Sequence, residues 1–449
     1  MVSLRLRACS SSKTGFSRKI VIIAALLIFA QTAGCQEISE KKEIAVFSLS
    51  YYQWQVPGGA LSLVDDQIRD VFSGLGRFDV IGMEYRLDSL GVDEFIAKIK
   101  EVKERDIELP ETVRFGQQAF TEEDFRRLVG AFIVVVPVMT SYELEREERE
   151  KYVSRIEISF NFIDVESAQG FGYFSLGVEA AAESAGGAVR LAADRIAPEL
   201  VFRLRTIPEF QLKTGVIDVR GRQVFLEFGS NMGVRLGDEY AIVTDTVLPT
   251  GYVTAEETGL LVIKDVKEEI SVGTLIYSDG KPDVGDQLRE VPRLGFDTAA
   301  TVRTVLAQSA YNPTDAVMML GIRQSTSRGF LTYRPVVGID VPFSLLGYVQ
   351  LPGLIVTMYG GGEIVWYLSR FQFVPTAAVG IGGSVPLRED EGFQISHAGG
   401  FVELVASYLF SRDIKVQLSV GYTGWFGLSI RSGDSFYGPH IGIGGTYKY

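Results

Sequence analysis

Histidine and cysteine are nearly absent from this chain, which has two of each among its 449 residues. Cys9 and Cys35 both lie within the first 35 residues, so no disulfide framework or cysteine metal site can hold the remainder together. His397 and His440 both lie near the C-terminal end, which leaves no place before them for a Ser-His-Asp triad or a histidine metal cluster. We therefore expect no enzyme activity, no cofactor and no metal site.

Basic residues are also scarce relative to acidic ones. The formal net charge is −12, and no basic block follows the first twenty residues. Binding to phosphates needs clustered Lys and Arg. Nucleic acid is therefore excluded as a partner.

No apolar run is long enough for a membrane-spanning helix, which needs about 20 residues. The longest, "IVIIAALLIFA" (20–30), follows a basic stretch and precedes the small residues of "QTAGC" (31–35). This arrangement is typical of an export signal, and we assign residues 1–34 to a signal peptide.

The residues around the cleavage position leave two interpretations open. "TAGC" resembles a bacterial lipobox, with Thr32 where that motif usually has Leu, which implies lipidation of Cys35 and a lipidated linker over 35–42. The alternative is ordinary cleavage nearby, with Cys35 an unmodified thiol. In lipoproteins, a residue such as Gln36 after the cysteine implies the outer membrane.

From Phe296 onward the hydrophobic period is two and glycine and aromatic residues are dense, as in β-strands. In "DIKVQLSVGYT" (413–423), Ile414, Val416 and Leu418 alternate with Lys415, Gln417 and Ser419. We predict eight such strands, at 297–308, 315–325, 329–343, 359–368, 371–384, 397–410, 413–424 and 437–449.

The connections between these strands alternate in length. Three are tight and contain Ser-Arg, namely "STSR" (325–328), "LSR" (368–370) and "FSRD" (410–413), whereas others such as 386–396 and 425–435 are longer. Short turns at one end, long loops at the other and an even strand number are typical of bacterial outer-membrane barrels. The predicted fold of residues 296–449 is an eight-stranded antiparallel transmembrane β-barrel, and the alternative is a soluble β-sandwich.

Charged residues in these strands must point inward, because Lys or Arg facing lipid near the midplane costs about 2–4 kcal/mol. An eight-stranded barrel is about filled by its side chains, and unpaired buried charges are costly. We therefore predict an interior salt-bridge network and no open channel, with the residues Arg303, Arg323, Arg334, Asp340, Glu363, Glu403, Lys415 and Lys448.

Aromatic residues are expected at both rims of the barrel, where the membrane interface favours them. The outer rim is predicted to contain Tyr359, Tyr422, Trp425 and Tyr437. The inner rim is predicted to contain Tyr447 and Tyr449. The ending "GGTYKY" (444–449) resembles the C-terminal assembly signal of outer-membrane barrels, through Gly444, Tyr447 and Tyr449. The resemblance to eight-stranded barrels of the OmpA/OmpX kind implies contact with outer-membrane lipid and with the barrel-insertion machinery.

An α/β domain is predicted over 43–206. Its order is β-α-β-α-α-β-β-β-α, with strands at "AVFSLS" (45–50), "FDVIG" (78–82) and "AFIVVVPVMTSYELE" (131–145) and a closing helix over 181–204. This pattern resembles the periplasmic domain of the CsgG family of curli-secretion lipoproteins and the N-terminal domain of TolB. The resemblance implies docking on periplasmic protein partners or self-association.

A small all-β module is predicted over 207–292, with strands on either side of Gly221 and turns at Gly229, Gly233 and Gly237-Asp238. It resembles the C-terminal β-barrel of the flagellar assembly protein FlgT. Asp238 and Asp286 follow glycines, and we interpret them as turn residues rather than metal ligands.

The sequence thus predicts a multidomain lipoprotein that is not an enzyme: an α/β domain and a small β module in the periplasm, on a barrel in the bacterial outer membrane. The predicted function is to fix a periplasmic interaction domain to this membrane as a scaffold or assembly factor. Two alternatives remain: a component of a CsgG-like secretion channel, and a surface adhesin acting through the outer loops.

Overall fold

The computed structural model describes residues 38–51, 56–87, 89–105, 112–115, 118–147, 151–167, 169–308, 315–330, 332–345, 354–385, 394–428 and 435–449. Residues Ile38–Tyr449 form one compact unit. The predicted signal peptide and Cys35 lie outside the described residues. The described part is mostly β, with three larger sheets and a short hairpin.

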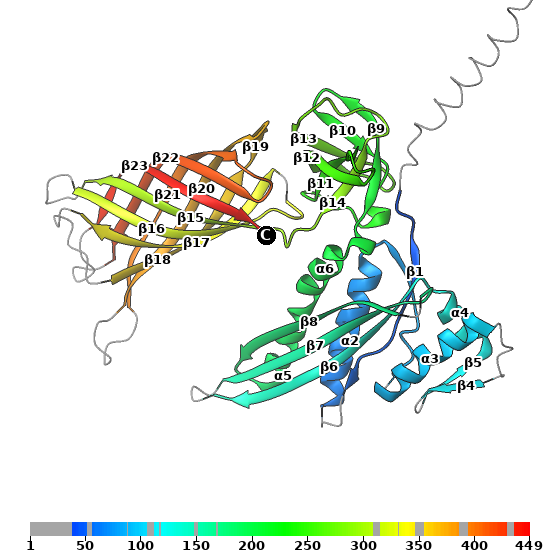
Figure 1. The fold of residues 1–449 in the computed structure, drawn as a ribbon. Helices are drawn as coiled ribbons and strands as arrows, with labels where there is room; N and C mark the ends of the chain where they lie inside the picture. The colour runs from blue at the N-terminus through cyan, green and yellow to red at the C-terminus, as the bar shows by residue number, and fades with distance from the viewer. Residues whose placement is uncertain are drawn as a thin grey trace, which may run out of the picture. The chain divides into compact units, whose positions relative to one another are not determined.

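The first sheet is mixed and has the strand order β3-β1-β6-β7-β8 (Figure 1). β1 is parallel to both β3 and β6, while β6, β7 and β8 are antiparallel neighbours. The short strand β2 also pairs with β6. The bounds are β1 Lys42–Val46, β2 Ser50–Tyr51, β3 Phe78–Ile81, β6 Ile133–Arg146, β7 Tyr152–Asp164 and β8 Gln169–Ala182.

Both faces of this sheet are apolar. Successive side chains of a strand point to opposite sides, and consecutive residues of β6 are apolar. Ile133 and Val135 of β6 belong to a core with the helices α2 (Gly58–Gly74), α5 (Ala185–Asp194) and α6 (Ile196–Thr206). Val134 and Val136 belong to a second core with α3 (Ser89–Arg105), α4 (Glu122–Gly130) and the hairpin β4 (Thr112–Phe115) and β5 (Gln118–Thr121). The sheet is therefore covered by helices on both faces.

The local order differs from the predicted one at two places. The hairpin β4–β5 lies between α3 and α4, where no strand was predicted. The predicted closing helix is divided at Arg195 into α5 and α6. Pro198 stands in the first turn of α6, where its missing N–H has no intrahelical partner to lose.

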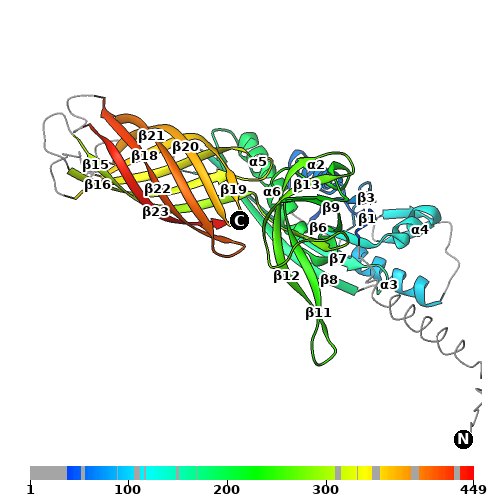
Figure 2. The same cartoon turned by 90° about the horizontal axis from the view of Figure 1, so that it is seen from above.

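The second sheet is a closed barrel of six strands in the order β10-β13-β12-β11-β14-β9 (Figure 1), and Figure 2 shows β11 and β12 as its long hairpin. Gly221, with a φ of 64°, makes the tight reversal between β9 and β10, a conformation that favours glycine. Two 3-10 turns, η1 (Pro208–Phe210) and η2 (Ser230–Met232), accompany these strands. The bounds are β9 Lys213–Arg220, β10 Gln223–Leu226, β11 Glu239–Val247, β12 Val253–Val266, β13 Ser271–Ser278 and β14 Gln287–Val291.

The third sheet is an eight-stranded antiparallel barrel, which confirms the predicted number and antiparallel arrangement of the strands in the C-terminal region. It closes because β15 pairs with β23 and β18 pairs with β20. The predicted strand 359–368 is divided between β18 and the short β19 (Trp366–Leu368), which pairs with β20. The bounds are β15 Phe296–Ala307, β16 Asp315–Thr326, β17 Tyr333–Ser344, β18 Leu354–Ile364, β20 Phe371–Val385, β21 Gln394–Leu409, β22 Ile414–Gly427 and β23 Phe436–Lys448.

Aromatic rings cover glycines on adjacent strands of this barrel. A Cβ atom on Gly338 would lie 2.4 Å from the hydroxyl oxygen of Tyr359, and one on Gly362 would lie 2.5 Å from the ring of Tyr333. The space above these glycines is therefore filled by tyrosine, a device known to stabilise β-sheets that contain glycine.

Candidate functional site

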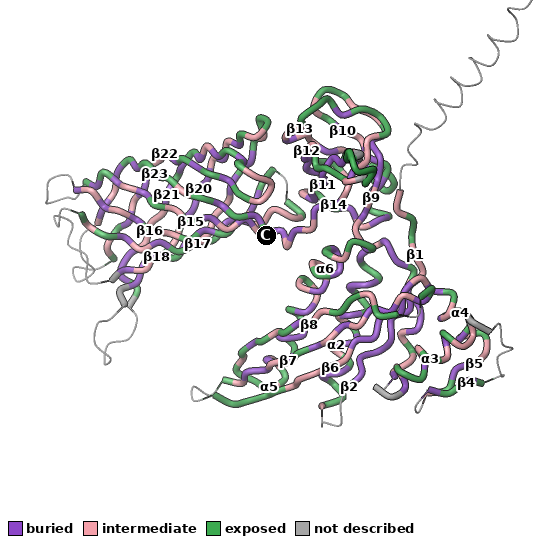
Figure 3. Tube along the Cα trace, in the orientation of Figure 1, coloured by how far each residue is buried: buried purple, intermediate pink, exposed green. Residues whose placement is uncertain are grey.

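The outer face of the barrel wall has no charged side chain within the described strands. Every Asp, Glu, Lys and Arg in the eight strands is buried, whereas large apolar side chains such as Leu418 (60%), Ile443 (61%) and Ile322 (63%) are exposed. The tube in Figure 3 shows this alternation of buried and exposed positions along the strands. A water-exposed surface normally carries charge, so this outer face is suited to an apolar solvent.

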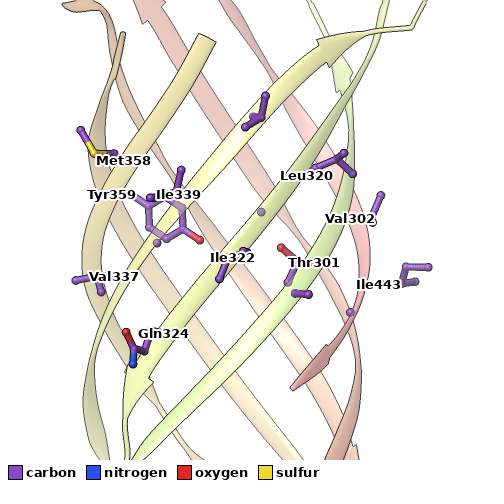
Figure 4. A pocket seen from close by; sticks show the side chains of 15 residues that line it. Thr301, Val302, Leu320, Ile322, Gln324, Val337, Ile339, Met358, Tyr359 and Ile443 are labelled. Atoms are coloured by element: carbon purple, nitrogen blue, oxygen red, sulfur yellow. The ribbon is translucent and has the colours of Figure 1, made fainter. Parts of the chain in front are cut away.

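The outer wall also has an apolar hollow of about 1050 Å³. Figure 4 shows its side chains on neighbouring strands, among them Val302, Ile322, Val337 and Ile443. It holds no Asp, Glu, Lys, Arg, His or Cys among its lining residues. The hollow therefore belongs to the apolar face and offers no group for acid, base or metal chemistry.

Inside the barrel, Glu403 of β21 is the centre of one ion-pair cluster. Its carboxylate pairs with Arg323 and lies 3.7 Å from Arg303, and its Oε2 lies 3.2 Å from Nε2 of His440. Arg303 also pairs with Asp340. Its guanidinium lies 4.4 Å from the ring centroid of Phe401, a cation–π distance.

A second cluster surrounds Asp297 of β15. Asp297 lies 2.7 Å from Nζ of Lys415 and 3.4 Å from Arg334, which donates to the hydroxyl of Tyr367 at 2.6 Å. Between the two clusters is a cavity of about 30 Å³, which Glu363 lines together with arginines from both. That volume holds about one water molecule, so side chains fill this part of the interior.

Lys448 differs in its partner from the other predicted interior residues. It is buried, but its ammonium pairs with Glu239 of β11, a strand of the six-stranded barrel. Arg293 pairs with the same carboxylate at 3.1 Å. All eight predicted interior side chains are buried, and seven of them lie within the eight-stranded barrel's own clusters and cavity.

The predicted network left out two interior acids, Asp297 and Asp315. It also did not include the contact between the hydroxyl of Thr423 and Nδ1 of His440, which lie 2.8 Å apart, although the alternation places both residues on the inward face. The unequal numbers of cations and anions in the predicted network indicated that two acids were missing from it. The predicted set has five cations against three anions, and Asp297 and Asp315, each at a strand start, bring the strands to five of each sign: Arg303, Arg323, Arg334, Lys415, Lys448 and Asp297, Asp315, Asp340, Glu363, Glu403.

Two of the aromatic residues predicted for the outer rim point into the barrel instead of outward. Tyr359 is 6% exposed and Trp425 is 0% exposed, and both have the inward parity of their strands. The period-two pattern itself requires this, since Trp425 is ten residues after the inward Lys415 and Tyr359 is four before the inward Glu363. Tyr422 is exposed and Tyr437 is partly exposed, as predicted.

The residues of the predicted assembly signal lie on β23 and just after it. Tyr447 and Tyr449 are each 47% exposed, and their ring centroids lie 4.7 Å apart. Gly444 pairs with Thr301 and Gln417, and a Cβ there would lie 2.6 Å from the carbonyl oxygen of Ala300. A side chain at position 444 would therefore press on the neighbouring strand.

A separate buried ion cluster centres on Arg205 of α6, which is 0% exposed. Its Nε lies 2.6 Å from Glu290 and its second terminal nitrogen 3.0 Å from Asp238, and Arg77 also pairs with Glu290 at 2.7 Å. Arg328 completes the set, 2.9 Å from Asp238. Burial alone would raise the pKa of the Glu290 carboxyl, but the charges of Arg205 and Arg77 outweigh it and hold the pKa below its usual range.

Replacing Glu290 by Gln is expected to lower the free energy of unfolding by about 3–5 kcal/mol at pH 7, because Arg205 and Arg77 lose a buried counter-charge. A carboxyl with a depressed pKa stabilises the fold above its unfolded pKa of about 4.3, and this contribution is lost as the pH falls further. The difference between wild type and Glu290→Gln should therefore shrink on acidification. Chemical unfolding in detergent at several pH values measures it.

The matched control is Glu199→Gln, because Glu199 is 34% exposed and pairs with Arg203 along the same helix. This change should cost no more than about 1 kcal/mol. An equal cost for both variants, or a difference independent of pH, would show that burial of the Glu290 pair is not what stabilises the fold.

The remaining polar candidates have structural roles. Asp238 accepts a bond from the backbone N–H of Arg235 at 2.8 Å, and Asp286 accepts one from that of Asp283 at 2.9 Å, as turn residues do. His397 lies 2.9 Å from the hydroxyl of Ser396. Among the described residues no group of three or more His, Cys, Asp or Glu is placed to hold a metal ion. No helix in the described part of the chain is long and apolar enough to cross a membrane.

Comparisons with known proteins give likeness to solved structures alone. No protein-family model matches the sequence, and no curated protein matches it. Neisserial surface protein A is 14% identical, over 34% of this chain and 97% of that one, with a TM-score of 0.28. The N-terminal β-barrel domain of Pseudomonas aeruginosa OprF is 11% identical, over 33% and 96%, with a TM-score of 0.22. The Vibrio cholerae outer membrane protein OmpT is 10% identical, over 71% and 95%, with a TM-score of 0.15.

Proposed function

We propose that the chain is an outer-membrane protein whose eight-stranded barrel anchors an interaction domain as a scaffold or assembly factor. One observation carries the proposal: in the described strands of the barrel, every charged side chain is buried and the exposed positions are uncharged. In water such a surface would be an aggregation hazard. In a bilayer it avoids the cost of about 2–4 kcal/mol for each charge on the lipid face.

The barrel interior favours an anchor over a channel. Ion pairs from Glu403 and Asp297 cross the interior, and the cavity between them is about 30 Å³. An aqueous pore needs a wider barrel than eight strands provide. The secretion-channel alternative would then require a conduit built from other parts of several copies.

The parts that precede the barrel are proposed to lie in the periplasm. The parallel pairing of β1 with β3 and β6, with helices on both faces, supports the resemblance to CsgG and TolB domains, and the closed six-stranded sheet supports the resemblance to the FlgT module. On this proposal the chain is a lipoprotein anchored at Cys35 and by the barrel. Its partners are then outer-membrane lipid, the insertion machinery and a periplasmic protein.

The purified chain is expected to give no steady conductance in planar lipid bilayers, because the interior ion pairs leave no continuous water path. A barrel of sixteen strands or more serves as the positive control, since such porins hold an aqueous channel. Reproducible steps of conductance from this chain would favour the secretion alternative.

Cell fractionation tests the location. The chain should be recovered with the outer membrane, need detergent for solubility, and migrate differently on a gel before and after heating, because a folded barrel resists detergent until heated. Protease added to intact cells tests the adhesin alternative, whose loops fall largely outside the described residues. A C-terminal fragment that is soluble without detergent would contradict the anchor.

A further inference from the structure

The strand β8 forms a long edge of the mixed sheet. It pairs with β7 along its whole length, from Gln169 to Ala182, and no described residue pairs with its other side. Figure 1 shows β8 as the outermost of these strands. Edge strands of this length normally carry protection against pairing with another chain.

The direction of the hydrogen-bonding groups in β8 follows from the hairpin that precedes it. The N–H of Glu147 donates to the carbonyl of Lys151 at 2.8 Å, so the odd-numbered residues from 151 to 157 bond to β6. The even-numbered residues of β7 then bond to β8, where they meet Leu176, Val178 and Ala180. The backbone groups of Tyr173, Ser175 and Gly177 consequently point away from the sheet.

One independent contact supports this assignment of outward backbone groups to the odd-numbered residues of β8. Arg195 donates to the backbone carbonyl of Glu179, which must therefore face outward like those of the other odd-numbered residues. This contact covers the end of the edge and leaves the segment from Tyr173 to Gly177 open.

The open segment lacks the usual protection of an edge. β8 has no Lys, Arg or Pro, and its single charged residue is Glu179, at the end that Arg195 covers. Tyr173 is 77% exposed. A Cβ atom on Gly172 would meet no atom within 4 Å. This edge is open for another strand to pair with it.

We propose that two copies of the chain pair through β8, antiparallel and with Ser175 opposite Ser175 of the second copy. In this register each Tyr173 lies opposite Gly177 and each Val178 lies opposite Gly172, so each of these two side chains faces a glycine. Phe174 faces Leu176 on the apolar side of the sheet. No acid faces an acid, because Glu179 lies opposite Phe171.

The occupant is a second copy because the strand complements itself under a two-fold axis. A C2 interface requires such self-complementarity, whereas a foreign peptide does not. The chain already uses the same pairing in the barrel, where Tyr359 lies directly opposite Gly338 and covers it. This inference goes beyond the anchor function, and a chain that stayed monomeric would leave that function untouched.

Replacing Ser175 by Pro tests the pairing in the full chain. Proline removes an N–H that points away from β7, so the sheet within each copy keeps its ladder. The two symmetric bonds at Ser175 are lost, and the dimer dissociation constant should rise about 10–100-fold. Sedimentation in detergent measures it, with far-UV circular dichroism as the check on folding and Ser175→Ala as the matched control that keeps the N–H.

Cysteine cross-linking fixes the register. In a chain refolded in detergent with Cys9 and Cys35 replaced by Ser, Ser175→Cys should form a disulfide-linked dimer on oxidation, because residues opposite each other lie about 5.5 Å apart. Tyr173→Cys alone should not, but should cross-link when mixed with Gly177→Cys. A monomeric wild type, a dimer unaffected by Ser175→Pro, or binding of an added peptide without any dimer would overturn the proposal.

Discussion

Arginine in place of Val420 is expected to destabilise the membrane-inserted barrel by about 2–4 kcal/mol. Val420 is 55% exposed and is the seventh residue of the fourteen-residue strand β22, so its side chain meets the middle of the apolar face. A guanidinium there has no interior partner and must remain in hydrocarbon or deform the bilayer. Unfolding by denaturant from lipid vesicles measures the change in free energy.

The matched control is Phe410→Arg, at the turn after β21. Phe410 is 71% exposed, more than Val420, but lies outside the strand and close to the predicted interface. Its replacement should cost about 0–1 kcal/mol, because the penalty depends on depth in the bilayer. Equal costs at both positions would mean that the outer face does not meet lipid.

Replacing Glu403 by Gln is expected to cost about 3–5 kcal/mol, because it removes one partner from a buried ion-pair cluster. Its two carboxylate oxygens serve Arg323 on one side and His440 and Arg303 on the other, so one change leaves two guanidinium groups short of negative charge. The same unfolding measurement in vesicles applies.

A double variant separates charge imbalance from the loss of contacts. Adding Arg323→Met to Glu403→Gln removes the unpaired cation and restores volume, so a large part of the lost stability should return. If adding Arg323→Met to Glu403→Gln costs as much stability as Arg323→Met alone, the two side chains are not energetically coupled.

The alternation of residue types predicts most of the barrel. Apolar and polar side chains take turns along β22 and β23, and this period alone determines which face each residue occupies. The predicted strand 413–424 corresponds to Ile414–Gly427, and 437–449 corresponds to Phe436–Lys448. Strand β18 was less accurate, since Val365 interrupts it before β19 and its early residues precede the predicted start.

The pairing of the interior charges is not contained in that period. Which acid meets which base depends on the stagger between strands, and Glu403 lies 80 residues from its partner Arg323. Lys448 illustrates the limit: its parity predicts an inward side chain, but its partner Glu239 belongs to a different sheet. The local pattern predicts which face of the sheet a side chain lies on, but it does not predict the ion-pair partner of that side chain.

Arg205 was missed for a related reason. An arginine near the C-terminal end of a helix is normally exposed, where it interacts favourably with the helix dipole. Here the side chain is fully buried by segments more than thirty residues away, including Asp238 and Glu290. The assignment of residues 43–206 as a separate α/β domain also stays a prediction, since the described residues form one compact unit.

The pairing of β15 with β23 means that the barrel can close only when its last strand is present. One of the two neighbours of β15 is β23, the last described strand, and paired residues such as Val305 and His440 are 135 or more residues apart in the sequence. Until that strand is present, one edge of β15 is unpaired. We therefore expect the early strands to need shielding from other chains until the ring can close.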